Sequence, residues 1–224
     1  MGKLSWDGVG ERIYETGVDH GVLYVMDENG YGRGVPWNGL TAVTESPSGA
    51  ESNKQYADNV VYLNLVSAEE FGGTIEAFTC PPEFSACDGL AEPSDGLTVG
   101  QQTRSTFGLS YRTKVGNDLA GQDAGYKLHL VYGLLASPSE KAYQTVNDSP
   151  EAMTLSWEVT STPVKVNDAL KPTSIITVDS TKVDAADLAV LEKKLYGAPA
   201  GAGGTPPETF ASLPLPAAVL AIFA

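Results

Sequence analysis

The amino-acid sequence predicts a mainly β protein: an antiparallel β-sandwich or barrel with one flanking helix and a long hairpin loop. Three observations support this fold class. Apolar and polar residues alternate with period two along several segments, which is typical of half-buried antiparallel strands. The 24 glycines and 14 prolines favour many turns over long helices. A chain of 224 residues is long enough for one large β domain with its own core.

The predicted strands follow from this alternation. Apolar residues alternate with polar ones over 153–160 and over 107–115, and in 126–135 the even positions through Leu134 form one apolar face. Two segments, 22–26 and 60–66, are apolar on both faces. A strand without a polar side must be covered twice, by a second sheet on one face and by another element or subunit on the other.

Glycine and polar residues predict the connections. The pair Asn29-Gly30 lies between two strand-like runs and predicts a hairpin. Gly30, Gly32 and Gly34 share one strand face, and no helical run follows them, so close backbone packing or a bulge is favoured over a nucleotide-binding loop. The polar stretch Ser46–Asp58 is expected to be a long mobile loop joining two strands.

One helix is predicted, over residues 185–196. Asp184 can cap its N-terminus, three leucines recur at helical spacing, and Gly197 is placed to end it in a left-handed conformation. Residues 175–178 just before it predict a short strand. We therefore expect one domain over residues 1–197, followed over 198–224 by a Gly/Ala/Pro linker (198–207) and an apolar docking tail (213–223).

The charge balance restricts the possible partners. Acidic residues outnumber basic ones by 28 to 14, giving a formal charge of −14. Such a surface repels phosphate backbones and anionic lipid heads, so tight electrostatic binding to nucleic acid or to a membrane is not expected. No secretory signal is visible, and the longest apolar run, 217–224, is far shorter than the ~20 residues that span a bilayer. DNA that passes without sticking remains compatible with this charge.

A search for chemistry predicts no catalytic, cofactor-binding or metal-binding residues, and hence no enzyme. Cys80 and Cys87 lack the tight spacing of zinc ligands, and without an export signal free thiols are favoured over a disulfide. His20 is expected in a turn and His129 in a strand, both in structural or solvent-facing roles, and the Gly-x-Ser-x-Gly motif of hydrolases is absent. Glycan hydrolases use two carboxylates that lie close together in the fold, and a sequence does not show which two these are. A glycan hydrolase is therefore a further alternative.

Several ordered segments resemble the major tail tube proteins of long-tailed, non-contractile bacteriophages. The resemblance spans nearly the whole chain and includes no catalytic signature. Its segments are Val60–Phe84, Phe107–Asp118, Gly125–Gly133, Ala136–Lys141, Asn147–Glu151, the strand through Trp157, Val178–Asp184, Leu195–Gly197 and Leu213–Pro216.

The resemblance implies a β-sandwich flanked by a helix that closes into hexameric rings, which stack into a hollow tube. Genomic DNA then crosses the lumen without specific binding. The implied partners are other copies of the chain and the tape-measure, tail-initiation and tail-terminator proteins. The implied location is the virion tail tube, with the host cytoplasm during assembly.

Candidate residues follow from this implication. A lone subunit would expose one of two apolar sets of the segment 60–66, and a ring would bury it. The first set is Val60, Tyr62 and Val66, and the second is Val61, Leu63 and Leu65. Acidic residues are expected to predominate on the lumen, with Glu45, Glu51 and Asp58 as candidates.

A protein of another class is also compatible with the sequence: a β-sandwich carbohydrate-binding or adhesive module. Such modules display aromatic side chains on one exposed face. Tyr14, Tyr24, Tyr31 and Trp37 are the residues that would supply it.

Overall fold

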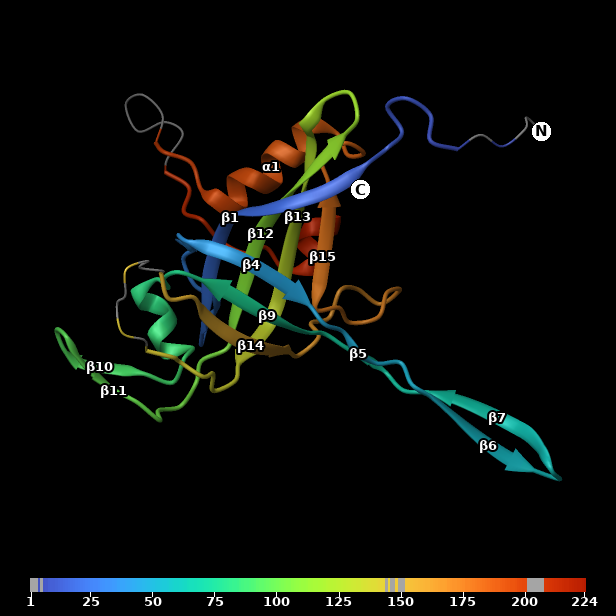
Figure 1. Ribbon diagram of the computed structural model, residues 1–224, viewed down its shortest axis with the longest axis horizontal. Helices are drawn as coiled ribbons and strands as arrows, with labels where there is room; N and C mark the ends of the chain where they lie inside the picture. The colour runs from blue at the N-terminus through green and yellow to red at the C-terminus, as the bar shows by residue number, and fades with distance from the viewer. Residues whose placement is uncertain (1–3, 5, 144, 146–147, 149–151, 201–207) are drawn as a thin grey trace.

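The structure, a computed structural model, describes residues 4, 6–143, 145, 148, 152–200 and 208–224 (Figure 1). The predicted mainly β architecture with one main helix is confirmed. The strands are β1 (Tyr14–Asp27), β2 (Gly30–Tyr31), β3 (Val35–Pro36), β4 (Leu40–Glu45), β5 (Ser48–Gly49), β6 (Ser52–Ala57), β7 (Val60–Val66), β8 (Glu69–Glu70), β9 (Gly72–Ala77), β10 (Ala91–Ser94), β11 (Leu97–Val99), β12 (Phe107–Asn117), β13 (Gly121–Ala136), β14 (Leu155–Ser161) and β15 (Ile175–Asp179). The helices are a 3₁₀ helix (Pro82–Ala86), α1 (Ala185–Tyr196) and α2 (Pro216–Leu220).

The described strands form one large antiparallel sheet and three small ladders. The large sheet has nine strands and runs β2–β1–β12–β13–β14–β9–β4, with β3 beside β1 and β15 beside β13. The small ladders are β5–β8, β6–β7 and β10–β11. Strands β12 and β13 form the long hairpin at the centre of the fold (Figure 1).

Strands β1 and β13 carry a hydrophobic cluster on each face. The first cluster joins them to β12, β9 and β14, and its largest buried side chain is that of Trp157. Its buried members are Leu23, Trp37, Ile75, Ala77, Phe84, Cys87, Phe107, Leu109, Tyr111, Val131, Leu134, Ala136, Trp157 and Val159. The expectation that segment 22–26 is covered twice is confirmed, since Leu23 belongs to this cluster and Val22 and Tyr24 belong to the other.

The second cluster lies beneath α1 and the C-terminal tail. Its buried members are Val22, Tyr24, Leu128, Leu130, Tyr132, Val178, Leu188, Leu191, Leu195, Leu213 and Val219. The buried hydroxyl of Tyr24 donates to the carbonyl of Leu195 at 2.9 Å, which ties the end of α1 to the sheet. The tail therefore packs on the domain, as its apolar composition predicts. Most of the predicted linker, residues 201–207, lies outside the described residues, as do 147 and 149–151 of the resembling segments.

The predicted bounds of the helix agree with the structure. Asp184 accepts a hydrogen bond from the backbone N–H of Ala186 at 2.8 Å, and α1 spans Ala185–Tyr196. Gly197 ends it with φ +77° and ψ 178°. The predicted left-handed helical conformation is thus wrong in ψ, although the positive φ still favours glycine.

Three other local predictions are wrong. The even positions of 126–135 do not form one face, because the backbone is irregular at Gly133 (φ +61°) and Leu134 points into the first cluster with Val131. His20 lies within β1, where the register with β12 shifts, and not in a turn. The segment Ser46–Asp58 is not a loop, because backbone pairing with β8 and β7 makes most of it strands β5 and β6 despite its polar composition.

Candidate assembly interface

A long hairpin, Ser46–Phe71, projects from the large sheet, and we call it the arm. It consists of the β5–β8 ladder at its root and the β6–β7 ladder beyond, and Figure 1 shows β6–β7 extending far from the rest of the domain. Backbone hydrogen bonds continue through the root: Ser46 N–H donates to the Gly72 carbonyl at 2.8 Å, and Ala50 N–H to the Ala68 carbonyl at 3.3 Å. The arm is therefore a continuous two-stranded ribbon.

The ribbon changes direction near its root. Gly49 (φ +84°) and Ala50 (φ +52°) both adopt positive φ, a conformation that costs a non-glycine residue about 1 kcal/mol or more. A Cβ atom at Gly49 would collide with the carbonyl oxygen of Ala68. This bend is built into the backbone at a site that requires glycine.

All six predicted interface residues lie on β7 and are exposed. Their exposed fractions run from 48% for Leu63 to 69% for Tyr62, and Tyr56 on β6, which the sequence analysis missed, is equally exposed. The six residues are Val60, Val61, Tyr62, Leu63, Leu65 and Val66. An apolar set this large on a two-stranded hairpin exceeds the scattered single residues usual on protein surfaces.

The two apolar faces differ from the sets predicted by simple alternation. Gln55 pairs with Leu63 but Tyr56 pairs with Val61, so Tyr62 is an extra residue that inverts the alternation beyond it. Since cross-strand partners share a face, the register defines two faces. Tyr56, Val61 and Val66 lie on one face, and Val60, Leu63 and Leu65 lie on the other. Both faces are exposed, whereas the prediction required only one.

The three lumen candidates occupy different parts of the arm and its root. Asp58 lies with Asn59 in the two-residue turn at the tip, and Glu51 lies just before β6. Glu45 is the last residue of β4 and takes part in a polar cluster. The structure therefore does not bring these three carboxylates together.

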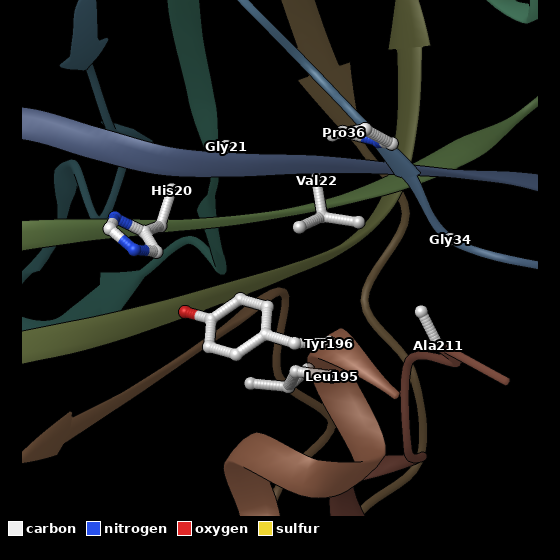
Figure 2. A pocket seen from close by; sticks show the side chains of 8 residues that line it. All are labelled: His20, Gly21, Val22, Gly34, Pro36, Leu195, Tyr196 and Ala211. Carbon is white, nitrogen blue, oxygen red and sulfur yellow. The ribbon is translucent and has the colours of Figure 1, made fainter. Parts of the chain in front are cut away.

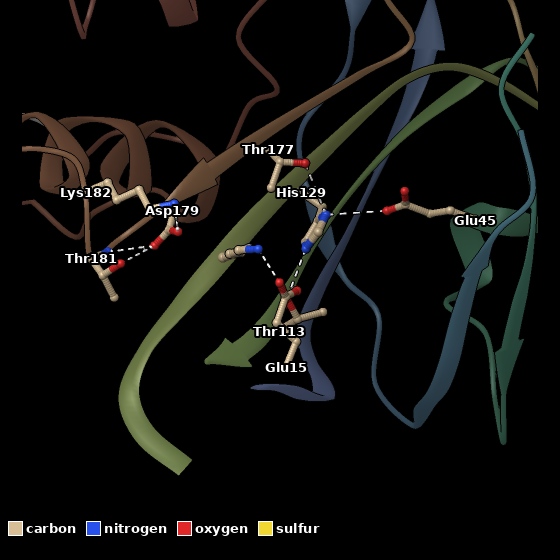
Figure 3. Close-up of polar contacts among 9 residues, drawn as sticks. Glu15, Glu45, Thr113, His129, Thr177, Asp179, Thr181 and Lys182 are labelled. Atoms are coloured by element: carbon tan, nitrogen blue, oxygen red, sulfur yellow. Dashed lines mark hydrogen bonds and ion pairs between the residues drawn. The ribbon is translucent and has the colours of Figure 1, made fainter. Parts of the chain in front are cut away.

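Glu45 belongs to a polar cluster between β4, β12, β13 and β15 (Figure 3). The buried Tyr111 donates its hydroxyl hydrogen to Glu45 Oε1 at 2.5 Å, and its ring stacks on that of His129 at 4.7 Å. Hydrogen bonding by His129, followed by that of Tyr111, holds the pKa of Glu45 below its usual range despite partial burial. The sequence gives no signal for this cluster, because its members come from four strands far apart in the chain.

A pocket of about 300 Å³ opens beside β1 and the C-terminal end of α1 (Figure 2). His20 and Tyr196 supply its titratable groups, and burial raises the pKa of Tyr196 to about 12. Its lining residues are His20, Gly21, Val22, Gly34, Pro36, Leu195, Tyr196 and Ala211. A protonated phenol beside one imidazole gives the pocket no nucleophile with an oriented base.

The structure gives little support to the other candidate sites. Tyr24 and Trp37 are buried and Tyr31 is half-buried, so only Tyr14 of the four aromatic residues is exposed and they form no common binding face. Both cysteines are free thiols, with Cys87 buried and Cys80 half-buried. Within the described part of the chain, no group of three or more His, Cys, Asp or Glu side chains is placed to hold a metal ion.

The described residues and the sequence comparisons define the class of protein only coarsely. It is a mainly β protein that carries an apolar hairpin arm. No helix among the described residues is long and apolar enough to span a membrane. No protein-family model matches the chain, and no curated protein matches its sequence.

Proposed function

We propose that this chain is a structural virion protein, the tail tube subunit of a long-tailed, non-contractile bacteriophage. In this proposal the domain is a β-sandwich that closes into hexameric rings, and the rings stack into a tube. One observation carries the proposal: β7 presents apolar side chains on both faces of the arm, and these side chains are exposed in the part of the chain that the structure describes. A two-stranded hairpin is marginally stable alone and needs a hydrophobic partner.

The partner that fits best is a second copy of the chain. The arm leaves one end of the domain and extends away from the large sheet (Figure 1). An arm that binds a different surface of the next copy makes a head-to-tail contact, which generates rings or open filaments. The resemblance to tail tube proteins selects stacked rings between these two outcomes, with tape-measure, initiation and terminator proteins as further partners.

The charge fits a tube that conducts DNA. Six copies at −14 each carry 84 formal negative charges per ring. A basic lumen would retain DNA, whereas an acidic wall repels it over a Debye length of about 8 Å at physiological salt. We therefore propose that acidic residues predominate on the lumen, with Glu45, Glu51 and Asp58 as candidates. A tube reconstruction with more lysine and arginine than aspartate and glutamate on the lumen would refute this assignment.

The assembly proposal is tested with Leu65→Asp and a matched control, Leu97→Asp. Both leucines lie on strands of two-stranded hairpins, and their exposed fractions are 54% and 55%. Each variant is coexpressed with the matching initiation complex and tape-measure protein and examined by electron microscopy. We expect Leu65→Asp to abolish tubes and Leu97→Asp to retain them. If the unaltered chain forms no tubes under these conditions, or if Leu65→Asp forms normal tubes, the proposal fails.

A further inference from the structure

The arm is joined to the domain by two chain segments, and each is fixed differently. The returning segment is held through Phe71, which packs on the first cluster and whose carbonyl accepts hydrogen bonds from the N–H and the hydroxyl of Ser161 at 3.1 and 3.2 Å. The outgoing segment begins directly after Glu45, the last residue of β4. Any side chain that fixes Glu45 therefore fixes the point at which the arm leaves the sheet.

The side chain of Glu45 is held by Tyr111, a member of the first cluster, and by His129. Its partner in the sheet is Gly73, which has no side chain. The hydroxyl of Tyr111 reaches Glu45 Oε1 at 2.5 Å, and His129 Nδ1 lies 3.4 Å from the same atom. Tyr111 is only 2% exposed, so its hydroxyl has little access to water as an alternative partner.

The two aromatic partners are themselves immobilised. The rings of Tyr111 and His129 are nearly parallel, at 3°. Thr113 Oγ1 lies 3.0 Å from His129 Nε2, and Thr177 Oγ1 lies 3.4 Å from Nδ1 (Figure 3). Strands β12, β13 and β15 thereby hold the hydroxyl of Tyr111 in a fixed position beside Glu45, at the end of β4.

Although backbone hydrogen bonds run through the root, a ribbon of only two strands leaves the direction of the arm adjustable. Beyond Glu45, the root of the arm is a two-residue β5–β8 ladder followed by the bend at Gly49 and Ala50. Two-stranded ribbons twist and bend easily because no second layer packs on them. A small change in a side-chain contact at the base of such a ribbon therefore moves its tip by a much larger distance than it moves the base.

From this geometry we propose that Glu45 is a positioning residue, which sets the direction of the arm through its hydrogen bond with Tyr111 and its contact with His129. The inference rests on the proposed function, since an arm that assembles subunits must leave the domain at a defined angle. It assigns Glu45 a role at the base of the arm in addition to its candidate place on the lumen.

The test measures the direction of the arm in unassembled subunits. Spin labels are attached to Lys54→Cys on β6 and Lys193→Cys on α1, both exposed positions, in the full chain with Cys80→Ser and Cys87→Ser. Pulsed electron resonance then gives the distribution of distances between the labels. We expect a distribution that is broader than that of the parent, or shifted from it, in Glu45→Ala and in Tyr111→Phe. Glu45→Gln, whose amide oxygen still accepts from Tyr111, should keep the distribution of the parent.

Tyr126→Phe is the matched control. It removes a hydrogen bond of the same kind, from the Tyr126 hydroxyl to Glu192 Oε1 at 2.7 Å, but on the side of the sheet that faces α1. Its distance distribution should equal that of the parent. Because Tyr111→Phe keeps the ring and its stacking, it decides the question even if Glu45→Ala does not fold.

The outcomes separate this inference from the proposed function. Unchanged distributions in folded Tyr111→Phe overturn the role of Glu45, whether or not tubes form. A broadened distribution supports the role even when no condition yields tubes, and that second result would count against the assembly proposal alone.

Discussion

Arg112 on β12 and Asp19 on β1 form a two-point ion pair across the sheet. Arg112 Nε lies 2.7 Å from Asp19 Oδ1, and Nη2 lies 2.9 Å from Oδ2. The pair stands where the register between the two strands shifts on both sides of Asp19, next to His20 with φ +52°. Its planar, bidentate geometry therefore holds the strands together where the regular ladder is interrupted.

The first prediction concerns acid stability. The hydrogen bond from Arg112 lowers the pKa of Asp19 in the folded state despite partial burial. A carboxyl with a lowered folded pKa contributes stability above its unfolded pKa, near 4, and loses that contribution as pH falls through the folded pKa. We expect Asp19→Asn to lose about 1 kcal/mol at neutral pH, since the pair is partly exposed.

Urea unfolding over a pH series measures this contribution. Glu45 and Asp179 also have lowered pKa values, so the wild type retains some acid sensitivity from other groups. The difference in free energy of unfolding between wild type and Asp19→Asn should shrink below about pH 4. A difference that stays constant across the series contradicts the assignment.

The second prediction concerns close packing at Gly34. A Cβ atom there would lie 2.7 Å from Tyr24 Cε1 and 2.9 Å from Ala211 Cβ, both well inside normal contact. We expect Gly34→Ala to lower the free energy of unfolding by about 1–3 kcal/mol. Gly100→Ala is the control, since its nearest new contact, Leu90 Cδ2, is at 3.8 Å. Equal unfolding midpoints for the two variants would show that the segment beside Tyr24 moves away without cost.

The third prediction concerns the cysteines. Burial raises the pKa of Cys87 to about 12, with a smaller contribution from Asp88, and also raises that of Cys80. Because the thiolate is the reactive form, Cys87 should resist thiol reagents until the protein unfolds, and Cys80 should react slowly. Replacing both with serine should leave assembly intact, at a cost of about 1–2 kcal/mol. A double variant that folds but does not assemble would restore a disulfide or metal role.

The fourth prediction concerns order in the arm. An uncovered two-stranded ribbon opens easily, so the amides of Ser46–Asp58 should exchange rapidly with deuterium in the free subunit. In assembled tubes the same amides should be protected, because a neighbour covers the apolar faces. The amides of β12 and β13 serve as the internal reference, protected in both states. Strong and equal protection of the arm in free and assembled subunits would exclude ordering on assembly.

The successful predictions rest on local interactions for the helix and on apolar patterning for the strands. The cap at Asp184 and the leucine spacing that follows it define α1, because all contacts needed to form a helix lie within one or two turns. Segment 22–26 was expected to be covered on both faces, and Leu23 and Tyr24 do enter opposite clusters. The sequence also led us to expect that a single subunit exposes apolar residues of β7, and these residues are exposed.

The sequence by itself therefore determined the mainly β class, the helix over 185–196, the double coverage of 22–26 and the apolar residues of the arm. Only the tertiary structure decided that Ser46–Asp58 is mostly a strand, that Tyr62 inverts the faces of β7, and that Leu134 changes sides at Gly133. It also decided that Glu45 meets Tyr111 and His129. The reason is physical: a helix is stabilised by near neighbours along the chain, whereas strand register and inter-strand polar contacts depend on partners that only folding brings together.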